Sequence, residues 1–449
     1  PISPCCSGTD PDMAENRSGR ARLPEPADVK VERIGAEGDG LSRLPDGTKL
    51  FVPGALPGET VTVRPVAARG DGWHAAAEII TNPSPARVDP PCPHFTRCGG
   101  CTLQHWRDAE YQAWKSGLLS HALRTAGYTP PEPLPYHPGL PGERRRLDFA
   151  ARRTAAGIVL GLHAPRSKEV VDLTDCLVLH PTLMALMQPI RVLLAGLQAL
   201  RREASVIINL LDAGPDLLLR LDAEPTLVDR TALTAFARAH AIPRVSAAVG
   251  QSPPETICLL RPETTVLSGI AVSPPPGAFL QATAEGEQAI VDAVLLGLPT
   301  KINSRTRIAE LYAGNGTLTF ALAKAVRVAA FEGDAAAVAA LKQSVNQSGL
   351  SGRIEATHRD LARQPLSAKE LSGFAAVVLD PPHAGAAAQI AQIAASATAT
   401  VIYVSCNPAT LSRDARTLRA AGYRLDRAAA IDQFLWSPRL ESVCVFRRG

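Results

Sequence analysis

The sequence predicts an α/β protein in which two smaller parts precede a large C-terminal sheet domain. From Arg307 onward, apolar strand-like runs alternate with helical segments, which is typical of a Rossmann-like, doubly wound sheet. Between residues 26 and 80, short β-type segments alternate with glycine turns, which predicts a small barrel of the OB type. Between residues 172 and 265, strand-like runs surround a helical pattern near residues 231–241, so we expect a central α+β domain there.

These patterns divide the 449 residues into a disordered lead-in at 1–25, the barrel at 26–85, the central domain at 86–273 and the C-terminal domain at 274–449. The lead-in is polar and lacks the apolar core of a signal peptide. Hydrophobic residues make up 46% of the chain, and no apolar run reaches the length of a membrane span. We therefore expect a cytoplasmic protein without membrane contact. The net charge of +4 is small and does not by itself establish a nucleic-acid partner.

Nine cysteines in a chain expected in the cytoplasm indicate metal binding or catalysis rather than a disulfide framework. Cys92, Cys98 and Cys101 lie close together, and two adjacent glycines allow the backbone to fold tightly around a ligand. Cys176 is the natural fourth ligand. Four thiolates suit zinc or an iron–sulfur cluster, and the C-x5-C-x2-C spacing, which fits neither common zinc-finger pattern, favours the cluster. Cysteines that serve only as core residues are the alternative.

Five arginines lie within residues 143–153. Their planar guanidinium groups could follow the phosphates of a nucleic acid and stack on its bases. A solvated basic face is the alternative, and the sequence leaves both open.

The first strand of the C-terminal domain ends in a glycine turn that contains Gly314 and Gly316, and the next strand ends in Glu332. Such glycines allow a close approach of the backbone to a nucleotide, and an acid at the end of the second strand suits ribose hydroxyls. The dinucleotide pattern G-x-G-x-x-G is absent from the sequence, which favours S-adenosylmethionine as the ligand.

Three further strand-like segments carry reactive side chains at their ends. Asp380 follows a buried strand and precedes two prolines, and Glu441 precedes the last strand. Cys406 ends the apolar run at 401–405, where Pro408 stops the strand, and ligands bind at this edge of open α/β sheets. Taken singly, each has a plain alternative: Asp380 could cap a helix, Glu441 could be a surface charge, and Cys406 could be a core cysteine. We assign Cys258 and Cys444 to the core.

Taken together, these motifs resemble the bacterial RNA uracil-5 methyltransferases, which make 5-methyluridine in tRNA and 23S rRNA. The resemblance covers nearly the whole chain: a TRAM-like barrel, CPHFTRCGGCTLQH, AFLQA, ELYAGNG, the acid of AFEG, LDPP, VSCNP and a terminal acid. The ordered set is far more specific than any one member of it.

The resemblance implies a C-terminal S-adenosylmethionine methyltransferase domain with Cys406 as nucleophile, Glu441 as base, and Asp380 orienting the base or the cofactor. It implies cofactor contacts from Gln281, Tyr312, Gly314, Gly316, Glu332 and Asp380. It implies a 4Fe–4S cluster on Cys92, Cys98, Cys101 and Cys176. The sequence departs from the family pattern at Thr283, Glu310, Thr317, His383 and Arg439, which leaves the implied nucleophile, base and ligands in place.

The expected reaction is methylation of carbon 5 of an unpaired or flipped-out uridine after the thiolate adds to carbon 6. We expect RNA as the partner, with 23S rRNA favoured over tRNA because tRNA-specific relatives typically lack both the barrel and the cluster cysteines. No obligate protein partner is implied. The alternatives are a tRNA uracil-5 methyltransferase, a DNA cytosine-5 methyltransferase, which normally presents its thiol as Pro-Cys, and a non-catalytic iron–sulfur protein that binds RNA.

Overall fold

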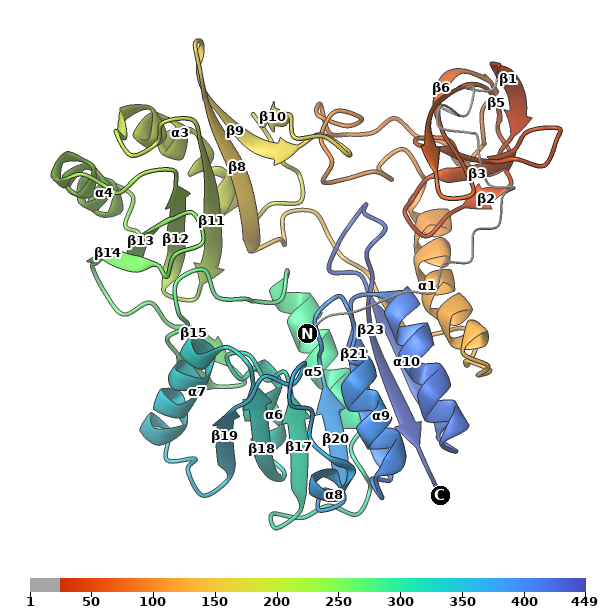
Figure 1. The fold of residues 1–449 in the computed structure, drawn as a ribbon. Coiled ribbons are helices and arrows are strands. Elements are labelled where there is room, and N and C mark those ends of the chain that lie inside the picture. The colour runs from red at the N-terminus through yellow and green to blue at the C-terminus, as the bar shows by residue number, and fades with distance from the viewer. Residues whose placement is uncertain (1–24) are drawn as a thin grey trace, which may run out of the picture. The chain divides into compact units, whose positions relative to one another are not determined.

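The computed structural model describes residues 25–449, which fall into two compact units that meet in sequence between residues 85 and 86. Figure 1 labels most of the helices and strands of both units. All but one residue of the predicted disordered lead-in lies outside the described residues. None of the helices in residues 25–449 is both long and apolar enough to cross a membrane.

The smaller unit is built on one six-stranded sheet with the order β1-β5-β6-β4-β3-β2. Its strands are β1 (Ala27–Lys30), β2 (Arg33–Ile34), β3 (Gly40–Arg43), β4 (Lys49–Val52), β5 (Thr60–Arg69) and β6 (Gly72–Asn82). Alternate side chains of β4 and β5 are buried in a common core, because successive residues of a strand face opposite sides. A turn joins β3 to β4, where Gly47 has a φ of +87° and Asp46 Oδ1 accepts a hydrogen bond from the Thr48 N–H at 2.8 Å.

The larger unit contains a seven-stranded sheet with the order β10-β9-β8-β11-β12-β13-β14. Its strands are β8 (Arg146–Thr154), β9 (Gly157–His163), β10 (Val170–Asp172), β11 (Glu203–Leu211), β12 (Gly214–Leu221), β13 (Arg244–Val249) and β14 (Glu255–Leu259). Helices α2 (Pro181–Met184), α3 (Met187–Gly196) and α4 (Leu227–Ala239) accompany it, and one hydrophobic core joins the helices to the sheet. The α4 helix begins before the predicted position because Thr226 and Asp229 form a capping box.

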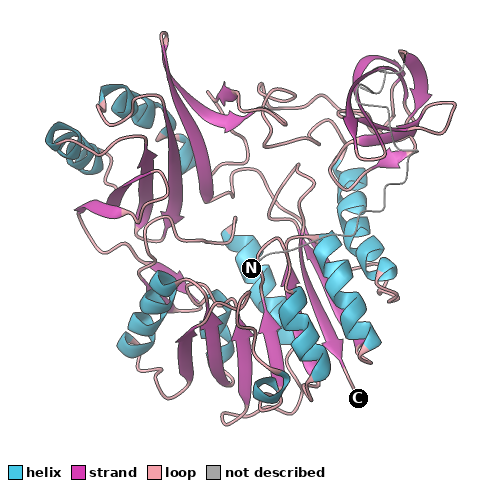
Figure 2. Ribbon diagram, in the orientation of Figure 1, coloured by secondary structure: helices cyan, strands magenta, loops and turns pink. Residues whose placement is uncertain are grey.

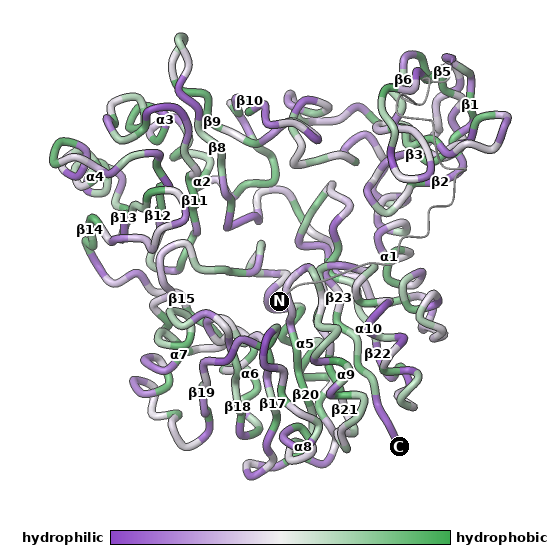
Figure 3. The backbone as a smooth tube through the Cα atoms, in the orientation of Figure 1, coloured by the Kyte–Doolittle hydropathy of each residue, from purple (hydrophilic) through white to green (hydrophobic). Residues whose placement is uncertain are grey.

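The same unit contains an eight-stranded sheet with the order β19-β18-β17-β20-β21-β23-β22-β7. Its strands are β7 (Tyr136–His137), β17 (Arg307–Leu311), β18 (Arg327–Glu332), β19 (Ile354–His358), β20 (Ala376–Leu379), β21 (Thr400–Ser405), β22 (Arg424–Ile431) and β23 (Glu441–Arg447). Strands β17 to β21 are parallel, and every residue of β20 and β21 is buried, as expected of strands covered on both faces. Figure 3 shows β20 and β21 as mainly hydrophobic.

Helices cover both faces of this eight-stranded sheet (Figure 2). Alternate residues of the central strands enter two separate cores, one shared with α1, α9 and α10 and the other with α5, α6 and α7. The helices are α1 (Asp108–Thr125), α5 (Ala284–Leu296), α6 (Thr317–Ala323), α7 (Ala335–Gln347), α8 (Ala368–Leu371), α9 (Ala387–Ala395) and α10 (Pro408–Ala420). A separate two-stranded sheet is formed by β15 (Thr265–Leu267) and β16 (Ile270–Val272).

The strand order changes direction at β17, because β18 and β19 lie on one side of it and β20 and β21 on the other. Ligands of open α/β sheets bind at such a switch point, beyond the carboxyl ends of the strands. The antiparallel strand β23 pairs Ser442 with Ser405 of β21, so the first residues of β23 lie at the same edge as the last residues of β21. The predicted α/β class with a Rossmann-like sheet is confirmed.

Two elements within residues 86–273, the predicted central domain, associate with the eight-stranded sheet. Helix α1 contributes Leu119 and Leu123 to the core that it shares with α10, and β7 pairs with β22 at the sheet edge. Residues 86–449 form one compact unit. The division into a central and a C-terminal domain at residue 273 therefore stays a prediction.

Candidate active site

The side chains predicted to act on substrate and cofactor come from the ends of neighbouring strands. Tyr312 follows β17, Glu332 ends β18, and Asp380 follows β20. Cys406 follows β21, and Glu441 is the first residue of the antiparallel neighbour β23. The topology thus brings Tyr312 and Glu441, which are 129 positions apart, to one edge of one sheet.

Cys406 lies between a buried strand and a helix. Pro408 is the first residue of α10, and Asn407 caps this helix by accepting the Ala409 N–H at 3.0 Å, so the thiol is held at the strand end. The Cys406 side chain is half-buried. Burial raises the pKa of the Cys406 thiol to about 11, with further increases from the carboxyls of Glu441 and Asp380 and an opposing effect of Arg439.

The two carboxyls beside Cys406 are themselves perturbed. Burial raises the pKa of Asp380 to about 7, opposed by a hydrogen bond from Gln281. Glu441 is only 3% exposed, and burial followed by the charge of Asp380 raises its pKa well above the ordinary value. A carboxyl group with such a raised pKa can exchange protons near neutral pH, which is the property that a general base requires.

Two glutamines connect these carboxyls. Gln281 Nε2 donates to Asp380 Oδ2 at 3.2 Å, and Gln281 Oε1 accepts from Gln433 Nε2 at 2.7 Å. Gln433 Nε2 also donates to Glu441 Oε2 at 2.9 Å. The sequence predicted Gln281 and missed Gln433. Its place directly after β22, next to Asp432, was the available signal.

The glycine turn after β17 is shaped for a close approach of the backbone. Tyr312, Gly314 and Gly316 all have positive φ, of 65°, 55° and 102°. A Cβ added at Gly316 would lie 2.7 Å from the Phe320 ring, while one at Gly314 would meet no atom within 4 Å. Glu332 Oε2 accepts the Gly314 N–H at 2.8 Å, which joins the turn to the acid at the end of β18.

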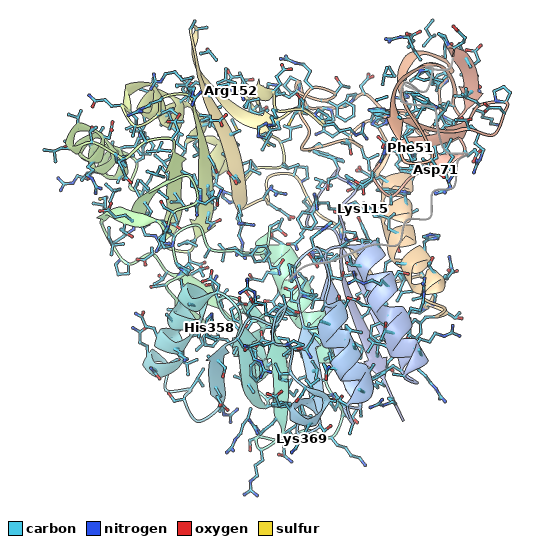
Figure 4. The ribbon with its side chains drawn as sticks, viewed as in Figure 1. Phe51, Asp71, Lys115, Arg152, His358 and Lys369 are labelled. Atoms are coloured by element: carbon cyan, nitrogen blue, oxygen red, sulfur yellow. The ribbon has the colours of Figure 1, made fainter. Side chains whose placement is uncertain are left out.

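The nine-residue loop between β22 and β23, residues 432–440, leads directly into Glu441 and is anchored by α1. Lys115, labelled in Figure 4, and Asp432 form an ion pair at 2.7 Å in which both side chains are fully buried. Lys115 Nζ also donates to the carbonyls of Phe434, at 3.3 Å, and Arg439. The sequence did not reveal this anchor because its two partners are 317 residues apart.

A second contact joins this loop to the cysteine motif. The Thr102 and Leu103 N–H groups donate to the Trp436 carbonyl at 2.8 and 3.1 Å. The Trp436 N–H donates to the Tyr111 hydroxyl at 2.8 Å, and that hydroxyl donates to Asp432 at 2.6 Å. The segment that follows Cys101 is therefore part of the support of the loop that leads to Glu441.

The four predicted ligands, Cys92, Cys98, Cys101 and Cys176, are all half-buried and are here termed the cysteine group. Burial raises the pKa of Cys101 to about 12, and the other three thiols add to the increase, so the four lie within electrostatic reach of one another. Within residues 25–449, however, no three His, Cys, Asp or Glu side chains stand together as a group that could hold a metal ion. The donor chemistry fits a thiolate-bound metal centre, while the ligand geometry does not show one.

Models of two protein families match the chain. The TRAM domain model matches residues 26–66, and the tRNA (uracil-5-)-methyltransferase model matches residues 276–448. An uncharacterized RNA methyltransferase of Brucella melitensis is 38% identical over 94% of this chain and 98% of its own length. The 23S rRNA (uracil(1939)-C(5))-methyltransferase RlmD of Pectobacterium atrosepticum is 34% identical over 93% of each chain. The chain belongs to the RNA uracil-5 methyltransferase family.

The same family contains a solved structure with a similar fold. The tRNA (uracil-54, C5)-methyltransferase of Pyrococcus abyssi, crystallised with S-adenosyl-L-homocysteine, covers 94% of this chain with a TM-score of 0.69 and 21% identity. At this identity the likeness shows the fold alone, and it agrees with the architecture expected from the sequence. Because this fold occurs in a tRNA enzyme along 94% of the chain, the barrel does not favour 23S rRNA over tRNA, contrary to the expectation from the sequence.

Three departures from the family pattern have a structural place. Thr283 caps α5 by accepting the Gly286 N–H at 2.9 Å. The His383 carbonyl accepts from Asn407 Nδ2 at 3.0 Å, and the Arg439 carbonyl accepts from Lys115. In this member of the family, the backbones of His383 and Arg439 take part in the support of the site, and their side chains are exposed.

Two of the five arginines in residues 143–153 neither follow phosphates nor form a solvated basic face, the two roles considered from the sequence. Arg145 pairs with Glu287 at 2.7 Å and donates to the Gln281 carbonyl at 3.2 Å, so it supports the segment that carries Gln281. Arg153 donates to four carbonyls of residues 194–200, at the end of α3. Sequence alone could not reveal this, because the partners are distant in sequence.

Proposed function

We propose that this protein uses S-adenosylmethionine to methylate carbon 5 of a uridine in 23S rRNA through a covalent adduct with Cys406. The observation that carries the proposal is the meeting of Cys406, Asp380 and Glu441 at the sheet edge that also carries the glycine turn. The family of the chain and the 34% identity to a 23S rRNA enzyme along 93% of each chain support it.

In the proposed reaction, the Cys406 thiolate adds to carbon 6 of the uracil, and the electrons of the carbon 5–carbon 6 bond move into an enolate. Carbon 5 thereby becomes nucleophilic enough to take a methyl group. S-Adenosylmethionine, when bound, supplies this group from a sulfonium centre. Gln281, Tyr312, Glu332, Asp380 and the turn at residues 314–316 are the proposed cofactor contacts.

Glu441 then removes the proton from carbon 5. The electrons of that C–H bond restore the carbon 5–carbon 6 double bond, and the bond between carbon 6 and the Cys406 sulfur breaks. Among the described residues no donor reaches Glu441 Oε1, whereas Oε2 is occupied by Gln433, so Oε1 is the atom available for the proton. A raised pKa makes the acid form of Glu441 stable enough to hold it.

We further propose that the cysteine group holds a 4Fe–4S cluster. Four half-buried thiols form a donor set that a cation would stabilise, because metal-bound thiols are ionised, and burial together with neighbouring thiols raises the pKa of Cys98, Cys101 and Cys176. The cluster lies outside the proposed reaction steps. Its expected role is structural, through the hydrogen bonds from Thr102 and Leu103 to the loop before Glu441.

The nucleophile is tested with RNA that carries 5-fluorouridine, since fluorine at carbon 5 cannot be removed as a proton. We expect a covalent complex with the wild type that withstands denaturing electrophoresis, and none with Cys406→Ala. A Cys406→Ala protein that still methylates uridine at the normal rate would disprove the adduct.

The substrate is tested by offering unmodified tRNA and protein-free 23S rRNA side by side with labelled cofactor. Label in the rRNA is expected, with mass mapping to locate the 5-methyluridine. Label in tRNA alone would assign the protein to the other substrate of the family and leave the chemistry at Cys406 intact.

A further inference from the structure

Gln433 occupies the centre of the hydrogen-bond network between the two carboxyls. It is 3% exposed and lies in the loop between β22 and β23. Its Oε1 accepts the Ala282 N–H at 2.8 Å, and its Nε2 reaches Gln281 Oε1 at 2.7 Å and Glu441 Oε2 at 2.9 Å. Every hydrogen-bonding atom of this side chain is therefore engaged with the site.

The Ala282 N–H determines the direction of these hydrogen bonds. A backbone N–H can only donate, so it must face the oxygen of Gln433, and the amide nitrogen must face Gln281 and Glu441. Gln281 then receives a donor at Oε1 and must turn its own nitrogen toward Asp380. The Ala282 N–H thus determines that Glu441 Oε2 and Asp380 Oδ2 both accept hydrogen bonds.

We propose that Gln433 is a positioning residue that fixes this direction and thereby leaves Glu441 Oε1 as the oxygen that takes the carbon 5 proton. The inference rests on the proposed function, because it takes Glu441 to be the base. It adds a residue that acts through Glu441 and Gln281 rather than on the substrate.

Two titratable groups face Glu441: Asp380 after β20 and Cys406 after β21. Arg439, in the loop before β23, acts on Cys406. Asp380 raises the pKa of Glu441, and the hydrogen bond from Gln433 lowers it. Loss of the Gln433 donor should therefore raise the pKa of Glu441 further and move the acidic limb of the pH–rate profile to higher pH.

The test uses Gln433→Met, which keeps the length of the side chain and removes its hydrogen bonds. Gln433→Glu is the second variant, because its carboxylate can still accept from Ala282 but places an oxygen against acceptor atoms of Gln281 and Glu441. The matched control is Gln389→Met on α9, a fully buried glutamine whose two hydrogen bonds, at 2.9 and 3.1 Å, go only to the Leu366 backbone.

The breakdown of the methylated Cys406 adduct, a step that follows addition of the thiolate and depends on Glu441, is measured in single turnovers with uridine-containing RNA from pH 5.5 to 9.5. For Gln433→Met we expect the acidic limb to move to higher pH. At the low-pH end the rate should fall about tenfold for each unit by which the pKa of Glu441 rises, and at high pH it should recover. Gln433→Glu should move it further, because it adds a negative charge beside Glu441. Gln389→Met should keep the wild-type profile even where its thermal stability falls.

A Gln433→Met profile that overlays the wild type would overturn the inference and leave Gln433 as a packing residue. Equal shifts in Gln433→Met and Gln389→Met would overturn it as well. Complex formation with 5-fluorouridine RNA distinguishes this failure from failure of the proposed function. That complex needs Cys406 and the methyl donor but no base, so the wild type and Gln433→Met should both form it if the proposed chemistry holds.

Discussion

The larger unit contains two thiol sites, Cys406 and the cysteine group. Burial raises the pKa of thiols at both, but different neighbouring groups add to the increase. Burial raises the pKa of Cys406 to about 11, and two carboxyls, Glu441 and Asp380, add to the effect. Burial also raises the pKa of Cys101 to about 12, but there the added charges are thiols of the cysteine group itself. A single thiol among acids suits reversible addition and proton transfer, whereas thiols that repel one another suit a shared cation.

Cys406 and the cysteine group also differ in the contacts that fix their positions. Cys406 is placed by a fully buried strand and a capped helix, so neighbouring residues determine its position. The motif from Cys92 to Cys101 lies in turns and irregular chain, fixed by hydrogen bonds such as Gly99 N–H to the His163 carbonyl at 3.0 Å. The loop before Glu441 connects the regions, since Thr102, Leu103 and Lys115 all bind its backbone.

The largest expected difference between the regions is produced by Glu441→Gln. This change keeps the shape of the side chain and removes the proton acceptor, so the rate of product release should fall by about 10²–10⁴. The adduct with ordinary uridine should form, accept the methyl group and persist on denaturing gels. Iron content should stay unchanged. Turnover at the wild-type rate would show that another group takes the proton.

Lys115→Met should damage the connection between the regions. It leaves Asp432 buried without its cation, which typically costs about 3–5 kcal/mol of unfolding free energy, measured by urea denaturation. The double variant Lys115→Met/Asp432→Asn should recover part of the loss, because it removes the uncompensated charge. As a control, Arg230→Met breaks the exposed pair with Glu255 and should cost much less, because solvent screens exposed charges. Equal losses in the two single variants would show that the loop does not depend on its buried anchor.

The same contrast explains how much the sequence could predict. Asp380, Cys406 and Glu441 were found because each adjoins an apolar strand, and the edge of a parallel sheet gathers strand ends from distant segments. The glycine turn with Gly314 and Gly316 followed from an equally local pattern.

The supporting residues left no such local pattern. Lys115 and Asp432 read as ordinary surface charges until the fold buries them against each other. Arg145 was considered for phosphate contact, yet its partner Glu287 and the Gln281 carbonyl lie more than 130 residues away. Long-range pairs of this kind require the three-dimensional structure.

Cys98→Ala should show whether the cysteine group holds a metal centre. We expect anaerobically purified wild type to be brown with about four iron and four sulfide per chain, as four thiolate ligands imply, and Cys98→Ala to be bleached. Cys258→Ala, which alters a core cysteine on β14, is the matched control and should keep the colour. Stoichiometric zinc without sulfide would replace the cluster by a zinc site.

The smallest expected effect concerns the reactivity of Cys406 in the free protein. Alkylation by iodoacetamide requires the thiolate, and a pKa of about 11 leaves only about a thousandth of the thiol ionised at pH 8. The rate, followed by mass analysis of the Cys406 peptide, should therefore rise about tenfold per pH unit between pH 8 and 10. Glu441→Gln removes one of the two carboxyls that oppose ionisation, so its alkylation at pH 8 should be faster than that of the wild type. Alkylation at pH 8 that is already at its maximum would show that the thiol is ionised despite its acidic neighbours.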